Sequence, residues 1–116
     1  MAAANYDILI EQGATFTLSI VWKDDEGVPI DISDCEARMQ IRRTYDSDPI
    51  ISLTTESDGG IVLGGVTGSV DVEVDAETTE NVEIRRGLYD LEIVFPDDVV
   101  VRLIQGSVEI SREVTK

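Results

Sequence analysis

The stretch Tyr89-Asp-Leu-Glu-Ile-Val-Phe-Pro-Asp-Asp-Val-Val-Val-Arg-Leu-Ile-Gln-Gly-Ser-Val-Glu-Ile110 decides the fold of this 116-residue chain. Its first half places an apolar side chain at every second position, which is the pattern of a β-strand with one buried face. Pro96 and the two aspartates after it suit a tight turn, because proline presets φ and aspartate tolerates left-handed backbone. The second half alternates again, with Val99, Val101 and Leu103 on one face and Val100, Arg102 and Ile104 on the other. The stretch therefore predicts a long hairpin at the centre of a sheet.

Outward from this hairpin, the same alternation recurs along most of the chain. It predicts strands at residues 6–10, 15–23, 35–43, 50–55, 61–63 and 69–74, separated by turns rich in glycine and aspartate. Asp75 suits a helix N-cap and predicts one short helix over residues 76–82. Roughly seven to nine short strands, with turn signals about every eight to twelve residues, predict an all-β fold, a single antiparallel β-sandwich with one short helix.

The chain is expected to form one domain. We predict a flexible N-terminal arm over residues 1–5, the β-sandwich over residues 6–111 and a C-terminal tail over residues 112–116. Cys35 is the single cysteine, so no internal disulfide stabilises the fold, and we expect it to act as a small buried apolar residue. No secretory signal pattern opens the sequence, and no apolar run approaches the ~20 residues of a membrane span, which predicts a soluble protein.

Charge is the strongest feature of the composition, with 24 acidic residues, 9 basic residues and a formal net charge of −15. Such a chain is repelled by phosphate backbones and by anionic lipid surfaces, so we expect neither nucleic acid nor membrane as a partner. The acid either forms a solvated surface that keeps a β-protein soluble, or faces a basic partner.

The residues needed for most enzyme chemistry are absent. The chain has no histidine, which removes the commonest general base and most zinc sites. The glycine-rich residues 59–65 lack the Gly-Lys-Ser/Thr of a phosphate loop and open a strand. A pair of carboxylates, as in glycosidases, is the enzyme chemistry that remains, but most of the six aromatic residues lie on apolar stripes. We expect no enzymatic activity and no cofactor.

Aspartates in two turns are the candidate metal ligands. Asp24 and Asp25 lie in one turn and Asp97 and Asp98 in the hairpin turn, and carboxylate oxygens are the ligands that Ca²⁺ prefers. Neither pair matches the twelve-residue calcium loop, and aspartate is common in turns for conformational reasons alone. The prediction is therefore that the chain holds no metal.

The second face of the hairpin is the candidate contact surface. A strand with one solvated face is expected to carry polar residues there, whereas this face also carries apolar ones, at Leu88, Val94, Val100 and Ile104. Two interpretations stay open. Either the short helix or the N-terminal arm covers these side chains, or they form a protein–protein interface.

Segments spread in order over nearly the whole chain share one resemblance. They are Ile10-Glu-Gln-Gly-Ala-Thr-Phe16, residues 22–32, Ala37-Arg-Met-Gln-Ile-Arg42, residues 53–56, Gly59-Gly-Ile61, Tyr89-Asp-Leu-Glu92 and Arg102-Leu-Ile-Gln-Gly-Ser-Val108. Together they resemble a family of small structural proteins of tailed bacteriophages and prophages, and more weakly the N-terminal domain of phage baseplate upper proteins. Asp98 departs from this family at a turn position where relatives tend to have glycine, which predicts slight strain.

The resemblance implies an immunoglobulin-like sandwich in a virion, made in the cytoplasm of a host bacterium and without catalytic residues. It implies that the partners are other phage structural proteins and that the protein is oligomeric in the assembled particle. In the first hypothesis the domain is an assembly or adaptor module of the tail or baseplate that attaches fibres or receptor-binding proteins. In the alternative it is a capsid decoration protein that bridges coat subunits.

Overall fold

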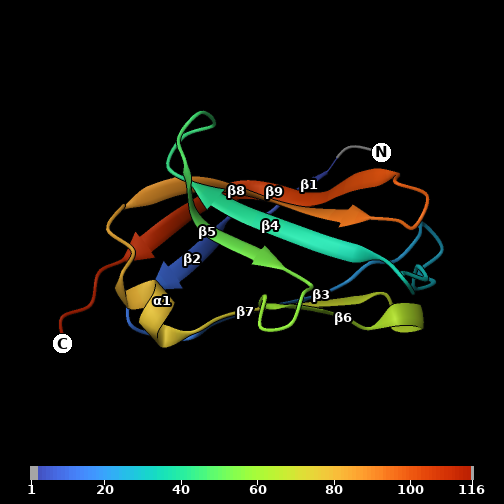
Figure 1. The fold of residues 1–116 in the computed structure, drawn as a ribbon, viewed down its shortest axis with the longest axis horizontal. Helices are drawn as coiled ribbons and strands as arrows, with labels where there is room; N and C mark the ends of the chain where they lie inside the picture. Colours follow the sequence, from blue (N-terminus) through green and yellow to red (C-terminus); the bar gives the residue numbers. More distant parts are fainter. Residues whose placement is uncertain (1–2, 116) are drawn as a thin grey trace.

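The structure is a computed structural model that describes residues 3–115. In these residues nine strands form two sheets that pack face to face, together with one short α-helix and one 3-10 helix (Figure 1). Strands β4 (Glu36–Arg42), β8 (Arg86–Val94) and β9 (Val100–Ser111) lie in the upper layer of the figure, and β3 (Phe16–Val21), β6 (Ile61–Leu63) and β7 (Ser69–Val74) form the lower one. The predicted β-sandwich with one short helix is confirmed.

The larger sheet, sheet A, has the strand order β1-β9-β8-β4-β5, and β2 also pairs with β9. Its remaining strands are β1 (Ala4–Asn5), β2 (Ile8–Glu11) and β5 (Pro49–Thr54). The smaller sheet, sheet B, has the order β3-β7-β6. The expectation of a purely antiparallel sandwich is wrong at one edge, because β1 and β2 run parallel to β9.

The core lies between the two sheets and follows the predicted alternation. Every second side chain of the central strands is buried, and these include Met39 and Ile41 on β4, Leu91 and Ile93 on β8, and Val70, Val72 and Val74 on β7. Trp22, expected as a core residue, is buried and meets Phe95 edge-on at a centroid distance of 6.0 Å. Cys35 is only partly buried, and this burial, followed by nearby aspartate charges, raises the pKa of its thiol.

A β-bulge in β9 decides which residues of the hairpin face the core. Leu91 pairs with Ile104 and Glu92 with Arg102, so Leu103 has no partner on β8. An extra residue of this kind shifts the alternation by one position, and both Leu103 and Ile104 turn inward. The expectation that Ile104 lies on the second face is therefore wrong, since Ile104 is only 6% exposed and belongs to the core.

The N-terminal segment is attached to β9 rather than loose. Ala4 and Asn5 form β1, which corrects the flexible arm expected over residues 1–5 at these two positions, while residues 1–2 lie outside the described residues. β1 and β2 hold one common register against β9, interrupted only at Tyr6 and Asp7. The sequence pattern does not predict this pairing, because the paired residues lie about a hundred positions apart in the chain.

Tyr89 and Gly106 fix the position of the backbone at Tyr6, between β1 and β2. Tyr89 stands opposite Gly106 on β9, and its hydroxyl donates a hydrogen bond to the Tyr6 carbonyl oxygen on the far side of that strand. A Cβ at position 106 would collide with the same oxygen, so only glycine fits. Burial raises the pKa of Tyr89 to about 12, which keeps its hydroxyl protonated as the donor.

Helix α1 (Ala76–Glu80) joins the two sheets at one end of the sandwich. As predicted, Asp75 caps it, accepting a hydrogen bond of 2.8 Å from the Thr78 amide. The hydroxyl of the fully buried Thr79 donates to the Ala14 carbonyl at 2.8 Å and accepts from the Gly13 amide at 3.1 Å. The helix is thus fixed to the corner between β2 and β3. Within residues 3–115, no helix is long and apolar enough to cross a membrane.

Replacing Thr79 with valine tests this attachment. The variant keeps the side-chain shape but leaves the Gly13 amide and the Ala14 carbonyl without a partner, and a buried unsatisfied group costs about 1–3 kcal/mol. We expect urea denaturation to show a loss of that size in the free energy of unfolding. Thr79→Ser is the control, because it keeps the hydroxyl and removes only a methyl group. Unchanged stability in Thr79→Val would contradict the attachment.

Candidate functional site

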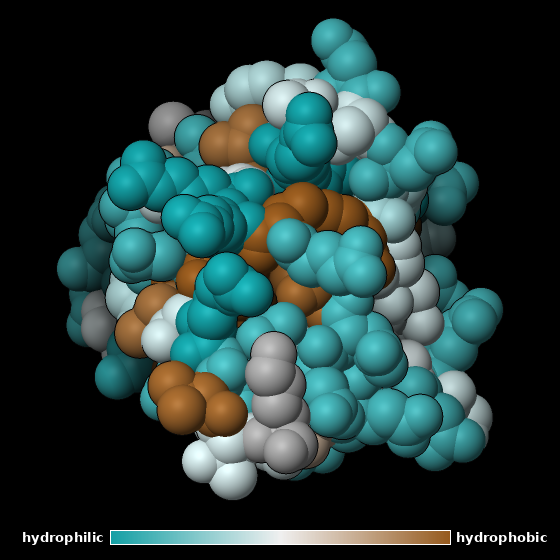
Figure 2. Space-filling model, turned by 90° about the vertical axis from the view of Figure 1, so that its left-hand side faces the viewer, coloured by the Kyte–Doolittle hydropathy of each residue, from teal (hydrophilic) through white to brown (hydrophobic). Residues whose placement is uncertain are grey.

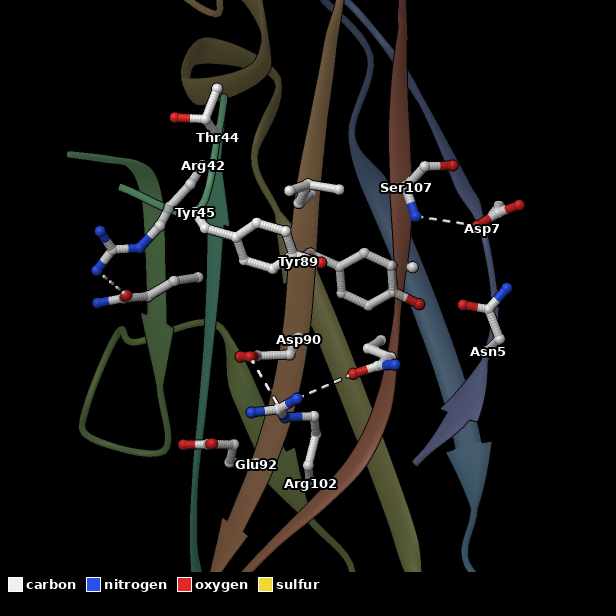
Figure 3. A pocket seen from close by; sticks show the side chains of 14 residues that line it. Asn5, Asp7, Arg42, Thr44, Tyr45, Tyr89, Asp90, Glu92, Arg102 and Ser107 are labelled. Atoms are coloured by element: carbon white, nitrogen blue, oxygen red, sulfur yellow. Dashed lines mark hydrogen bonds and ion pairs between the residues drawn. The ribbon is translucent and has the colours of Figure 1, made fainter. Parts of the chain in front are cut away.

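The outer face of sheet A, formed by the side chains of β4, β8 and β9 that point away from the core, carries a hollow. It is an open depression of about 620 Å³ (Figure 3). Charged and amide side chains from the N-terminal segment and from β4, β8 and β9 line it, including Asp7, Gln40, Arg42, Asp90, Glu92, Arg102 and Gln105. Tyr45, from the loop after β4, also lines it and is largely exposed.

Arginine–carboxylate pairs order this face. Arg38 Nε lies 2.8 Å from Glu92 Oε1, and Arg102 Nε lies 3.6 Å from Asp90 Oδ2, with Arg102 also donating to the Gln105 side chain. No other ion pair is found in the described part of the chain. Exposed pairs of this kind contribute only about 0–1 kcal/mol to stability, so their effect is to hold charged groups in position at the surface.

The two carboxylates at the centre of the face differ in their surroundings. Burial, and then the charge of Glu92, raises the pKa of Asp90, while the arginines around it act in the opposite direction. Each carboxylate has its own arginine partner, so neither is an isolated acid of the kind that a glycosidase needs. The absence of enzymatic activity stays a prediction.

Three of the four apolar interface candidates lie on this face. Leu88 is partly buried in the depression, and Val94 and Val100 pair with each other across the hairpin, with Val100 44% exposed. The fourth, Ile104, is in the core for the reason given above. The helix packs at the corner between β2 and β3, and β1 lies beside β9 instead of across the face. Neither therefore covers these side chains.

Two aspartate substitutions separate the core position from the surface position. Ile104→Asp places a charge in the core and is expected to lower the free energy of unfolding by more than about 4 kcal/mol. Val100→Asp changes an exposed side chain, and its effect is expected to stay within about 0.5 kcal/mol. Chemical denaturation of the two variants measures both values, and equal losses would contradict the placement of the bulge.

The candidate calcium ligands hold turns together. Asp24 Oδ1 accepts hydrogen bonds from the Glu26 and Val28 amides at 2.9 and 3.0 Å, and Asp97 Oδ1 accepts one from the Val99 amide at 3.2 Å. Asp98 has a φ of 68°, a left-handed conformation that favours glycine, and the Asp25 side chain makes no such bond. In residues 3–115 no three metal-ligating side chains gather in one place.

A second hollow, of about 290 Å³, lies at the end of the sandwich where α1 packs. Figure 2 looks at this end and shows hydrophobic atoms near its centre, ringed by hydrophilic residues. Val82 and Ile110, which line the hollow, are buried core residues, and Gln12 beside them donates to the Val82 carbonyl at 3.0 Å. This hollow thus lies over the end of the core, and Gln12 lines it.

Asp7, on the margin of the large depression, accepts a hydrogen bond of 2.9 Å from the Ser107 amide. This bond lowers the pKa of Asp7 below its ordinary value of 3.8. A carboxyl whose pKa is lower in the folded state stabilises the fold above its unfolded pKa, and the contribution disappears as the pH falls through the folded value.

The pH dependence of an asparagine variant tests the role of Asp7. Asparagine carries no charge, so we expect Asp7→Asn to be less stable than the natural chain at pH 7. The difference should shrink as the pH falls below the ordinary carboxyl value of 3.8, and should vanish once Asp7 itself is protonated in the folded protein. Thermal unfolding of both proteins across this range measures it. A difference in stability that stays constant as the pH falls would show that Asp7 acts through something other than its charge.

The solved structures that match this chain identify its fold. There are 186 such chains, and one is a VGSC beta subunit, from work on the multimeric cell-adhesive interactions of these subunits. The match has a TM-score of 0.51 and 11% sequence identity, and covers 96% of this chain and 93% of that one. The fold is an immunoglobulin-like β-sandwich. At this identity the likeness concerns the fold alone. No protein-family model matches the sequence, and no curated protein matches it significantly.

The strand orders β9-β8-β4 and β3-β7-β6 correspond to strands G-F-C and B-E-D of immunoglobulin-like domains. In antibody domains a tyrosine precedes the second cysteine of the inter-sheet disulfide by two residues. Here Tyr89 precedes Leu91, which is fully buried. Leu91 therefore occupies the position of the disulfide cysteine of antibody domains, which agrees with a fold stabilised by apolar packing and not by a disulfide.

The arginines of the outer face were not singled out as site residues from the sequence. Arg38 and Arg42 alternate with polar residues on β4, and Arg102 sits among valines on β9. The available signal was that basic residues are few in this chain, 9 against 24 acidic ones, yet these three arginines fall on outward positions of the predicted strands. Their convergence depends on the order of strands in the sheet, which the sequence does not reveal.

Proposed function

We propose that this chain is a non-enzymatic protein–protein interaction module that binds its partner through the outer face of sheet A. The observation that carries the proposal is the gathering of Arg38, Arg42 and Arg102 with paired carboxylates on one face of a chain whose net charge is −15. The strands of sheet B, by contrast, contain acidic residues and no basic one. Most of the surface repels an acidic neighbour, and this face does not.

The composition of the face suits a protein rather than a small ligand. Small-molecule sites are mostly apolar clefts that enclose the ligand, whereas this depression is open and lined by charged and amide groups. Protein interfaces are enriched in arginine and place apolar contacts among polar ones. Leu88, Val94 and Val100 supply the apolar contacts, and the arginine pairs fix the register of the partner.

The proposed setting is the particle of a tailed bacteriophage, with the protein made in the cytoplasm of the host bacterium. There it joins fibres or receptor-binding proteins to the tail or baseplate. The support for this setting is the sequence resemblance, which runs through residues 10–16, 22–32, 37–42 and 102–108, and the fold that the resemblance implied. The outer face is the surface through which the module would assemble.

Quantitative mass spectrometry of purified particles tests the proposal. The natural chain is expected in small copy number, matching a ring of the tail. Arg42→Glu combined with Arg102→Glu should lower its content at least about tenfold, because the reversed charges repel the partner. Arg112→Glu changes an exposed arginine outside the sheet and is the matched control.

Each other result has a definite meaning. Hundreds of copies would replace the tail role with capsid decoration. Absence of the natural chain from the particles would overturn the phage setting. Full incorporation of the double variant would overturn the outer face of sheet A as the contact surface, provided that the variant unfolds at the same denaturant concentration as the natural chain.

A further inference from the structure

Strand β3 forms an edge of sheet B whose backbone is open. It pairs with β7 on one side and with no strand on the other among residues 3–115. On the opposite side of β7, the Glu73 amide donates to the Gly60 carbonyl and the Ser69 carbonyl accepts from the Gly64 amide. Facing residues of an antiparallel pair direct their backbone groups either both toward each other or both away from each other. Glu73 and Ser69 direct theirs away from β3, so their partners Thr17 and Val21, and Ser19 between them, direct theirs to the open side of β3.

The core beside this edge is incompletely covered. Phe16, Leu18 and Ile20 point inward but stay partly exposed. Lying at an edge does not by itself explain this, because Ile51 on β5, Ile10 on β2 and Ile61 on β6 are buried, although Leu63 on β6 is also partly exposed. The C-terminal tail does not cover the gap either. Its Glu113 amide donates to the Gln12 side chain, and beyond this contact Val114 is 94% exposed.

β3 also lacks the features by which proteins protect an edge. Natural edge strands carry charges, proline or bulges that prevent another strand from pairing. The sequence Phe-Thr-Leu-Ser-Ile-Val has no charge and no proline, and its register with β7 is continuous. β5, the edge strand at the far side of sheet A, begins with Pro49 and has a register irregularity with β4.

The fold itself indicates what belongs at this edge. In immunoglobulin-like domains of the constant type, strand A lies beside strand B in the A-B-E-D sheet. The N-terminal strands of this chain pair instead with β9, in the other sheet. The place beside β3 is therefore a strand position that the described residues leave empty.

We propose that β3 accepts a strand from a protein partner, an extended segment with alternating apolar and basic side chains. The apolar side chains cover Phe16, Leu18 and Ile20, and the main chain bonds to Thr17, Ser19 and Val21. The basic side chains lie on the outer face of sheet B, where Asp71 and Glu73 are the charged residues of the neighbouring strand. A second copy of this chain is a poor occupant, because both copies carry a net charge of −15.

Amide hydrogen exchange followed by NMR tests this inference, with a synthetic peptide of alternating valine and lysine as the probe. In the free protein, the amides of Thr17, Ser19 and Val21 should exchange fast, and those of Leu18 and Ile20 slowly. Peptide at millimolar concentration should slow the first three at least about tenfold. Fast exchange at Leu18 and Ile20, or no slowing at the other three, would overturn the proposal.

Two substitutions at one position supply the matched comparison. Ser19→Pro removes an amide that does not bond to β7, which an edge strand tolerates, and should abolish the slowing at Thr17 and Val21. Ser19→Ala loses the same hydroxyl bond to Asp71 but keeps the amide, and should bind the peptide like the natural chain. Equal protection in both variants would show that the peptide binds elsewhere.

A modified peptide gives the same information if Ser19→Pro does not fold. With N-methyl groups on the residues that would pair with β3, the peptide keeps its charge and apolar side chains but loses its donors. Protection of Thr17, Ser19 and Val21 should then be lost. Unchanged protection would overturn strand addition. These readouts do not involve the outer face of sheet A, so they stand apart from the proposed function.

Discussion

The extra residue at Leu103 is the constraint on which sheet A depends. Side chains alternate along a strand, so a regular β9 that buried Val101 and Leu103 would turn Ile104, Val108 and Ile110 toward solvent. The bulge lets both halves of β9 contribute to the core. It also leaves Val100 and Arg102 on the same outward face as Gln105 and Ser107, beside Asp90 on β8. The same register shift thus decides which β9 side chains enter the core and which lie on the outer face of sheet A.

The length of β9 decides which strands lie at the edges of the two sheets. β9 is long enough to bind β1 and β2 along its free side, and Gly106 allows the chain to approach closely where Tyr89 reaches the Tyr6 carbonyl. Because the N-terminal strands are held there, they are not beside β3. The molecule therefore presents a charged face with apolar side chains on one sheet and an open edge on the other, the two surfaces that we propose bind protein partners.

Alternation along the chain was enough to predict most strands, and the Asp75 cap predicted α1, because both signals are local. The bulge was missed because residues 99–104 are apolar on both faces, so nothing in the pattern marks the extra residue. The parallel pairing of Ala4 and Asn5 was missed because it joins opposite ends of the chain. The cluster of Arg38, Arg42 and Arg102 was missed because it depends on which strands are neighbours. Strict alternation therefore assigned Leu88, Val94 and Val100 to the correct face of the sheet and assigned Ile104 to the wrong one.

Site-specific photo-crosslinking in the phage particles proposed above tests most directly whether the outer face of sheet A binds a partner. A photoreactive side chain at position 100 samples the outer face of sheet A, and one at position 62 samples the outer face of sheet B, where Val62 is 67% exposed. We expect a covalent product with another particle protein from position 100 and none from position 62. A product from position 62 alone, or no product from position 100 in particles that contain the protein, would contradict it.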